Sequence, residues 1–230
     1  MAVKLFSALY YIPFYCMSVR DASPTRAGID IFPALFMLLP GSIVVAALTT
    51  RLGRFRWAIW IGWALTTLGT GLLLLLDLHT KYVVLAVVLG IFGVGSGMVL
   101  TSVNVGIQAI SKVEDAAMAA SMYGFMRSLG MPLGVAISGT IFQNAMSSKL
   151  SSYGLPQAIA HDSERYIYVL RSMAHDDPQR IAVLESYLHG FRAVFVLMTC
   201  VSASAFVISL CIKKFSMDKK LQSRFSVRPT

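Results

Sequence analysis

Residues 82–110 read YVVLAVVLGIFGVGSGMVLTSVNVGIQAI and contain no charged side chain. An α-helix needs about 20 predominantly apolar residues to cross the hydrocarbon core of a bilayer, which is about 30 Å thick. Hydrocarbon offers no hydrogen-bond partners, so a segment inside it must satisfy its own backbone, as a helix does. This stretch therefore predicts a membrane-spanning helix, so the chain is expected to fold within a lipid bilayer.

The composition of the whole chain has the same character. Of the 230 residues, 56% are hydrophobic and only 13% are charged, and the mean hydropathy is +0.68. Soluble domains carry about 25% charged residues, because charged side chains cover a surface that faces water. The composition thus excludes an ordinary soluble domain and indicates an integral membrane protein.

Five further apolar segments flank this stretch. The segment 116–146 contains one charge, Arg127, and the segment 5–19 is short for a span. A secretory signal peptide is the alternative for 5–19, but the bulky core at 10–15 favours a spanning helix whose first turns are missing. We expect an all-α membrane protein, with a six-helix transmembrane bundle over residues 1–215 and a basic cytoplasmic tail over 216–230. The predicted spans are 5–19, 29–50, 58–76, 82–110, 116–146 and 190–212.

The net charge of +9 comes from lysines and arginines that cluster between the apolar segments. Basic residues concentrate on the cytoplasmic side of membrane proteins, so their distribution predicts that both chain ends are cytoplasmic. It argues against a nucleic-acid partner, because no base-stacking motif accompanies the basic residues. The predicted cytoplasmic residues are Lys4, Arg51, Arg54, Arg56, Lys112 and the basic residues from Lys213 to Arg228.

The long polar stretch at residues 147–189 is predicted to form an outer loop between the fifth and sixth spans. Apolar residues recur at helical spacing from Tyr166 to Met173, and Asp177 followed by Pro178 is typical of a helix start. We therefore expect two short amphipathic helices at the outer membrane interface. The stretch is either a lid over a substrate path or a solvated connector.

No pattern in the sequence indicates an enzyme, a metal site or a cofactor site. The four histidines all lie in the polar outer segments. The cysteines Cys16, Cys200 and Cys211 lie in apolar segments, without the spacing of metal ligands or of a disulfide framework. We expect no catalytic activity, no cofactor and no bound metal.

Several motifs follow one another along nearly the whole chain. They are YYIPFY at 10–15, SPTRAGIDIFP at 23–33, RLGRFRW at 51–57, GWALTTLGTGLLLLL at 62–76, GIFGVGSGM at 90–98 and FMRSLGMPLGVAISGTIFQN at 125–144. In this order they resemble the C-terminal half of the major facilitator superfamily, specifically its fungal fourteen-span drug:proton antiporter family of toxin and multidrug efflux pumps. The N-terminal half of that family has no counterpart in this sequence.

The resemblance implies proton-coupled efflux of small amphipathic molecules, such as drugs, toxins or secondary metabolites, by alternating access. The implied partners are the lipid bilayer, a small-molecule substrate, protons, and either the missing N-terminal half or a second copy of the chain. The plasma membrane is the expected location, with the vacuolar membrane as the alternative. Two other functions stay open: a truncated fragment that only docks to another half, and an uptake carrier for amino acids or siderophores.

Polar side chains inside the predicted spans are the candidate cavity or gating residues. A charged side chain at the bilayer centre costs about 2.5–3.5 kcal/mol, so Arg127 must face protein or a water-filled cavity unless it snorkels to the headgroups. Asn104 and Gln108 lie four residues apart on one helix face, where they either meet substrate or bond between helices.

Three other groups complete the candidate residues. Tyr10, Tyr11 and Phe14 suit a cavity wall for planar apolar substrates, or equally an aromatic belt at the membrane interface. A tight basic loop is either a cytoplasmic gate, as the resemblance implies, or a simple anchor at the inner surface. Two glycine pairs with GxxxG spacing predict close helix packing. The loop residues are Arg51, Arg54 and Arg56, and the glycines are Gly93, Gly97, Gly130 and Gly134.

Overall fold

The computed structural model describes residues 1–52, 56–78, 80–112, 114–174 and 177–212. Within those ranges the chain forms nine α-helices and no β-strand. Arg54 and the predicted tail at 216–230 lie outside the described residues. The helices are α1 (Ala2–Ser18), α2 (Pro24–Asp30), α3 (Phe32–Leu52), α4 (Arg56–Leu73), α5 (Tyr82–Ile110), α6 (Ala116–Ser152), α7 (Ala158–His161), α8 (Ser163–Ser172) and α9 (Pro178–Leu210).

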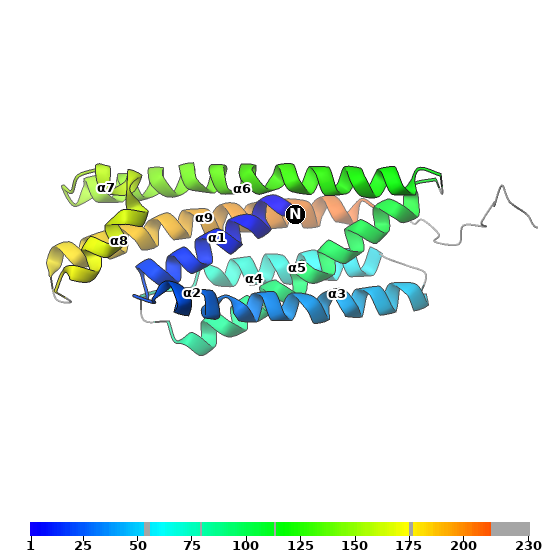
Figure 1. The fold of residues 1–230 in the computed structure, drawn as a ribbon, viewed down its shortest axis with the longest axis horizontal. Helices are drawn as coiled ribbons and strands as arrows, with labels where there is room; N and C mark the ends of the chain where they lie inside the picture. Colours follow the sequence, from blue (N-terminus) through cyan, green and yellow to red (C-terminus); the bar gives the residue numbers. More distant parts are fainter. Residues whose placement is uncertain (53–55, 79, 113, 175–176, 213–230) are drawn as a thin grey trace, which may run out of the picture.

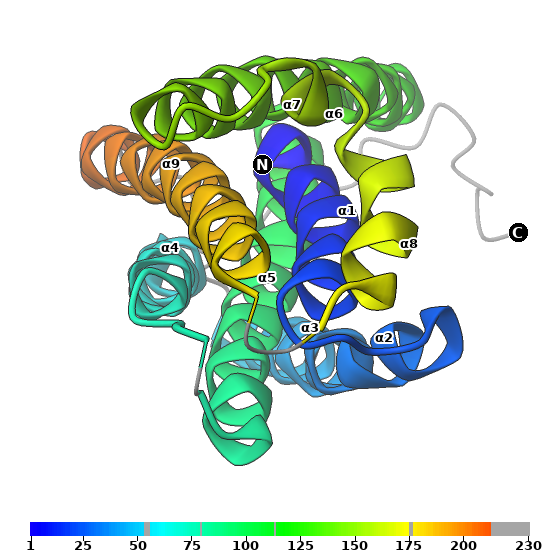
Figure 2. The same ribbon diagram turned by 90° about the vertical axis from the view of Figure 1, so that its left-hand side faces the viewer.

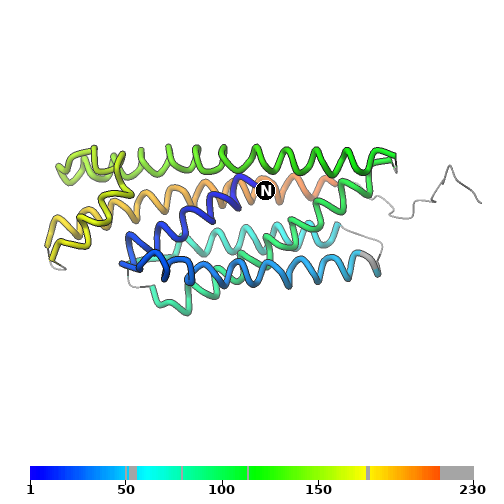
Figure 3. Tube along the Cα trace, viewed as in Figure 1, coloured from blue at the N-terminus to red at the C-terminus, as the bar shows by residue number. Residues whose placement is uncertain are grey.

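Four segments of the described chain are long and apolar enough to cross a membrane. They are Pro24–Thr49, which joins α2 to most of α3, and the helices α5, α6 and α9. The helices α1 and α4 have 17 and 18 residues, and neither meets the same standard of length and apolarity. The arginine, threonines and glycines of α4 dilute its hydropathy, and α1 begins near the middle of the bundle (Figure 3). By length and composition alone, the described residues therefore contain four candidate spans, fewer than the six expected.

The long helices form an elongated bundle with two sides. On one side α6 packs against both α1 and α9, and on the other α5 packs against α3 and α4, as Figure 1 shows. Contacts between α4 and α9 join the two sides. Seen along the bundle, α8 lies beside α1 and far from α4 (Figure 2). The short helices α7 and α8 thus gather at one end of the bundle, next to α1.

The observed bounds of α5 agree with the predicted span, whereas the two helices that adjoin the polar stretch at residues 147–189 extend beyond their predicted spans. The helix α5 covers the predicted 82–110, whereas α6 continues to Ser152 and α9 begins at Pro178 rather than at residue 190. The Asp177 side chain accepts a hydrogen bond from the Gln179 backbone N–H (2.9 Å), and Pro178 takes the first helical position. Of the two short helices expected in the outer loop, α8 is separate and the second forms the first turns of α9.

Glycines on α5 allow the closest approach in the bundle, the one to α3. A Cβ added to Gly93 would meet the carbonyl oxygen of Ala34, and one added to Gly97 would meet that of Leu38, both well inside 3.0 Å. The Ser42 hydroxyl also donates to the Gly97 carbonyl oxygen at 3.2 Å. Backbone packed on backbone is how membrane helices associate, because lipid supplies no hydrophobic force between them.

A second glycine seam holds α1 against α6. A Cβ on Gly134 would meet the backbone of Val3 within 3.0 Å. The Ser7 hydroxyl donates to the Gly134 carbonyl oxygen, and Ser138 donates to the Ser7 hydroxyl, each at 2.9 Å. These buried hydrogen bonds fix the register of α1, and so the positions of the aromatic residues that follow on it.

Candidate functional site

The aromatic run of α1 divides between the core and an open surface. Tyr11 and Phe14 are 3% and 7% exposed, and they pack into a ring cluster with residues of α6 and α9. In that cluster the Phe14 ring centroid lies 5.4 Å from that of Phe142 and 5.3 Å from that of Phe191. Tyr10 is 38% exposed and lies at the edge of the cluster. Of the three aromatic candidates, Tyr10 is thus the one that a small molecule can reach most freely.

Two cavities meet at Tyr10. The larger, of about 450 Å³, lies between α1, α2 and α8, and the smaller, of about 160 Å³, lies between α1, α6 and α8. Tyr10, Phe14 and Glu164 line both cavities, and the Tyr10 hydroxyl donates a hydrogen bond to the Glu164 carboxylate. Apolar walls with a few convergent polar groups are typical of sites for small molecules. The larger cavity also carries Arg165 and Arg171, so both signs of charge are present among its polar groups.

Ion pairs connect α8 and the start of α9 to the end of α1. Asp21 accepts from Arg171 of α8 and from Arg180 of α9, each at 3.1 Å. Arg171 also donates to the backbone carbonyls of Met17, in the last turn of α1, and of Ala22, just after that helix. Asp21 has a φ of 56°, a left-handed conformation that a non-glycine residue adopts at a cost. This network holds α8 in place as one wall of the larger cavity.

Arg127 lies on the α6 face that packs against α1, one turn before Gly130. It is partly exposed, and within the described part of the chain it makes no hydrogen bond or ion pair. Nearby on the same helix, the Tyr123 hydroxyl donates to the Leu100 carbonyl oxygen of α5 at 3.3 Å. The guanidinium is therefore free to bind a partner that this part of the chain does not supply.

Asn104 and Gln108 satisfy each other. The Gln108 amide donates to the Asn104 carbonyl oxygen at 3.0 Å, across one turn of α5. Gln108 is exposed, whereas Asn104 is half-buried. This bond uses one donor of Gln108 and the acceptor of Asn104, so the Asn104 amide nitrogen and the Gln108 oxygen can still bind other groups.

The basic loop is described only at its two ends. Arg51 is exposed in the last turn of α3, and Arg56 begins α4 with its guanidinium 4.7 Å from the centre of the Trp60 ring. A cation–π contact of this kind is worth about 0.5–1 kcal/mol where it is exposed. The contact ties Arg56 to its own helix.

Lys4 is the residue that sequence reasoning placed wrongly. It is 1% exposed, and its Nζ has no hydrogen-bond partner. The Nζ lies 5.0 Å from the centre of the Trp63 ring and 5.4 Å from that of Phe92. A cytoplasmic position was expected, but the start of α1 lies near the middle of the bundle (Figure 1), and the Lys4 side chain extends to rings of α4 and α5. Hydropathy does not reveal this depth.

Replacing Lys4 with methionine is expected to stabilise the protein. A charge in hydrocarbon costs about 2.5–3.5 kcal/mol, whereas cation–π contacts return about 0.5–2 kcal/mol. The free energy of unfolding should therefore rise by roughly 1–2 kcal/mol, measured by thermal unfolding of the purified chain in detergent. Lys4→Arg keeps a charge and should give no gain. A methionine variant that melts below the wild type would contradict the prediction.

Glu164, Asp21 and Arg171 were not among the site residues expected from the sequence. Their only signal was a density of charge in the outer segment, which equally fits a solvated loop. The pairings of Glu164 with Tyr10 and of Arg171 with Asp21 span about 150 residues of sequence, so local patterns do not predict them.

Comparison with known proteins agrees with this architecture. The profile of the family described as Major Facilitator Superfamily matches residues 1–135. MFS transporter L2 of Phoma sp. is 32% identical over 225 residues, which are 96% of this chain and 38% of that protein. Efflux pump FUS6 of Gibberella fujikuroi is 25% identical over 99% of this chain and 42% of its own length. An Acurin A biosynthesis cluster MFS-type transporter of Aspergillus aculeatus is 27% identical, again over 99% of this chain and 42% of its own. The chain thus spans about two fifths of the length of these relatives.

Proposed function

Because the chain belongs to the Major Facilitator Superfamily, we propose that it forms the C-terminal part of a transporter that exports small amphipathic molecules in exchange for protons. It is a multi-pass membrane protein whose relatives include named fungal efflux pumps. In the proposal its long helices are one six-span half of the transporter, and alternating access moves this half against another. The proposed location is the plasma membrane, with the vacuolar membrane as the alternative.

The cavity pair at Tyr10 is the observation that carries the export proposal. The larger cavity has aromatic and aliphatic walls with Arg165 and Arg171 among them, and the Glu164 carboxylate lies where the two cavities meet. This combination suits a compound with a planar apolar body and a polar or cationic group. Tyr10 and Phe14 would contact the apolar body, and Glu164 would bind the polar group when its bond to Tyr10 opens. Arg127 is proposed as a charge that meets the other half of the transporter.

Lys4 supports the proton as the coupling ion. Among the described residues it is the one basic side chain of α1, and it is enclosed by rings rather than by carboxylates. The charged form of a buried amine without a hydrogen-bond partner is costly, so protonation of Lys4 depends on access to water. We propose that Lys4 exchanges a proton when the halves separate and admit water.

The test is export by a fusion of the N-terminal part of MFS transporter L2 with this chain, in place of its own C-terminal part. Cells that carry the fusion should retain less of an amphipathic cationic dye than control cells, and a protonophore should abolish the difference. The 230-residue chain alone should not transport in liposomes, because one half supplies only one wall of the cavity. Gradient-dependent transport by the chain alone would refute the two-half mechanism. Accumulation of the dye through the fusion would favour an uptake carrier.

Topology gives a separate prediction. Basic residues concentrate on the cytoplasmic side, so residue 157 should lie outside the cell and residue 112 inside. Both positions are exposed, and Gln157→Cys and Lys112→Cys can be made in a variant without native cysteines. An impermeant thiol reagent should label the first in intact cells and the second only after permeabilisation. The opposite pattern would invert the topology.

A further inference from the structure

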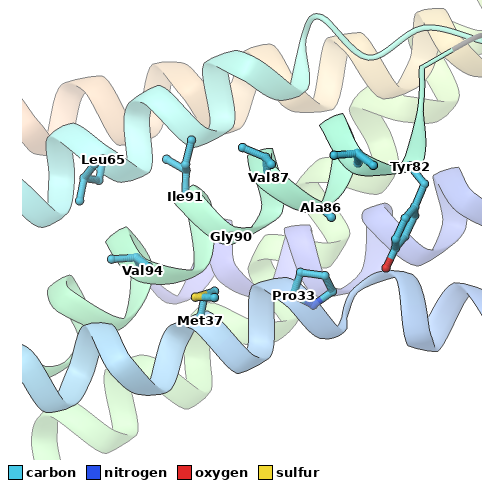
Figure 4. A pocket seen from close by; sticks show the side chains of 10 residues that line it. Pro33, Met37, Leu65, Tyr82, Ala86, Val87, Gly90, Ile91 and Val94 are labelled. Atoms are coloured by element: carbon cyan, nitrogen blue, oxygen red, sulfur yellow. The ribbon is translucent and has the colours of Figure 1, made fainter.

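Another cavity lies away from Tyr10, on the flank of the bundle between α3, α4 and α5. It has a volume of about 610 Å³, and its walls are almost entirely carbon. Figure 4 shows Met37 and Pro33 of α3 on one side, with Val87, Gly90 and Val94 of α5 on the other. Leu65 of α4 completes the wall. A groove without polar groups cannot orient an amphipathic substrate, so it requires an apolar ligand.

The position of the groove limits the source of that ligand. Its α3 wall belongs to the candidate span Pro24–Thr49, and its α5 wall belongs to the candidate span Tyr82–Ile110. On α5, the neighbouring Val83 is 68% exposed and Val87 is 57% exposed. The groove therefore opens sideways into hydrocarbon, where acyl chains of lipids are the abundant apolar molecules.

Gly90 makes the groove deep. On the same helix, Gly93 and Gly97 lie against the α3 backbone, where no side chain fits. A Cβ at Gly90 would meet only the Met37 side chain, at 3.7 Å, which is an ordinary contact. Helix packing therefore does not require a glycine at this position. The missing side chain leaves space that an acyl chain can fill, and filling it restores dispersion contacts.

The end of the groove near the start of α5 is basic. Tyr82, which lines the groove, has the Arg26 guanidinium 5.6 Å from its ring centre. The Arg26 side chain is 60% exposed and pairs with Asp30 at 3.3 Å. Lys81, the residue before α5, is also exposed. Two basic side chains at the membrane end of an apolar groove match the phosphate and the acyl chain of one lipid.

We propose that this groove binds a glycerophospholipid, with an acyl chain along Gly90 and the phosphate beside Arg26 and Lys81. The site is separate from the cavities at Tyr10, so it does not depend on the export function. The lipid would fill the angle between α3, α4 and α5 and so stabilise the crossing of these helices.

Native mass spectrometry of the purified 230-residue chain tests the proposal. The chain is extracted in mild detergent, exchanged into excess detergent and analysed for retained lipid. We expect the wild type to retain one phospholipid and Gly90→Phe to retain none, because the ring occupies the place of the acyl chain. Lys81→Glu should lower retention at least about fivefold, the effect of losing one basic contact with a phospholipid headgroup.

Gly71→Leu is the matched control. It adds a large side chain to a glycine of α4 outside the groove, where a Cβ would meet only the Thr199 side chain, at 3.9 Å. This variant should retain the phospholipid as the wild type does, and circular dichroism should show equal helix content in all variants. Equal retention by wild type and Gly90→Phe, an unchanged Lys81→Glu variant, or a retained sterol in place of a phospholipid would each overturn the proposal.

Discussion

Replacement of Gly97 by valine is expected to force α3 away from α5 and to deplete the protein from the membrane. The new Cβ would meet the carbonyl oxygen of Leu38, which is backbone and cannot rotate aside. Overpacking a core commonly costs about 1–3 kcal/mol, and a clash with backbone lies at the upper end or beyond. The Ser42 bond to the Gly97 carbonyl would be lost as well. Membrane abundance and the thermal midpoint in detergent should both fall.

Gly124→Val provides the control for this prediction. Gly124 also lies inside a long helix, α6, but nothing is within 4 Å of a Cβ built on it. Valine is a slightly poorer helix former than alanine, yet better than glycine, so the helix itself should not suffer. Equal midpoints for Gly97→Val, Gly124→Val and wild type would show that the α3–α5 seam does not limit stability.

Arg127→Ala is expected to reduce export by the fusion about tenfold or more, while its membrane abundance stays unchanged. Arg127 has no partner within the described residues, so its removal leaves no buried group unpaired in this half. Hydrogen bonds to charged groups are worth about 1.5–3 kcal/mol, which corresponds to roughly 10- to 150-fold if they form only during transport.

Two further substitutions sharpen the interpretation. Arg127→Lys should restore export only in part, because an ammonium cannot reproduce the planar multi-donor guanidinium. Lys112→Ala removes an exposed charge between α5 and α6 and should leave export near the wild-type level. Wild-type export by Arg127→Ala would assign this arginine to lipid headgroups instead of the partner half.

The sequence predicted what depends on composition and on short spacings. The membrane class, the bounds of α5 and the family were each predicted correctly from motifs and hydropathy. How deeply a residue is buried in the bundle, and which neighbours it faces, depend on where the helices cross. The sequence did not predict these features. Lys4 was assigned to the cytoplasmic side from the distribution of basic residues, yet its side chain is buried in the bundle.

The same limit applies to the cavities. Tyr11 and Phe14 were expected either at a cavity wall or in an interfacial belt; both line the smaller cavity, but Phe142 and Phe191, from helices remote in sequence, also pack against them. Glu164 reaches Tyr10 only because the outer segment folds back over α1. The apolar groove is likewise formed where α3, α4 and α5 meet, which hydropathy does not encode.

The double attachment of Asp21 has a mechanical consequence. One carboxylate links the end of α1 to α8 through Arg171 and to the start of α9 through Arg180. If α1 tilts at this end, α8 and the start of α9 would move with it, so that the three elements would rotate as one rigid body. The centre of that rotation would be the contact nearer the start of α1, where Ser7 forms hydrogen bonds with α6. A small shift of α1 at that seam would therefore produce a larger displacement of α8 at the Tyr10 cavities.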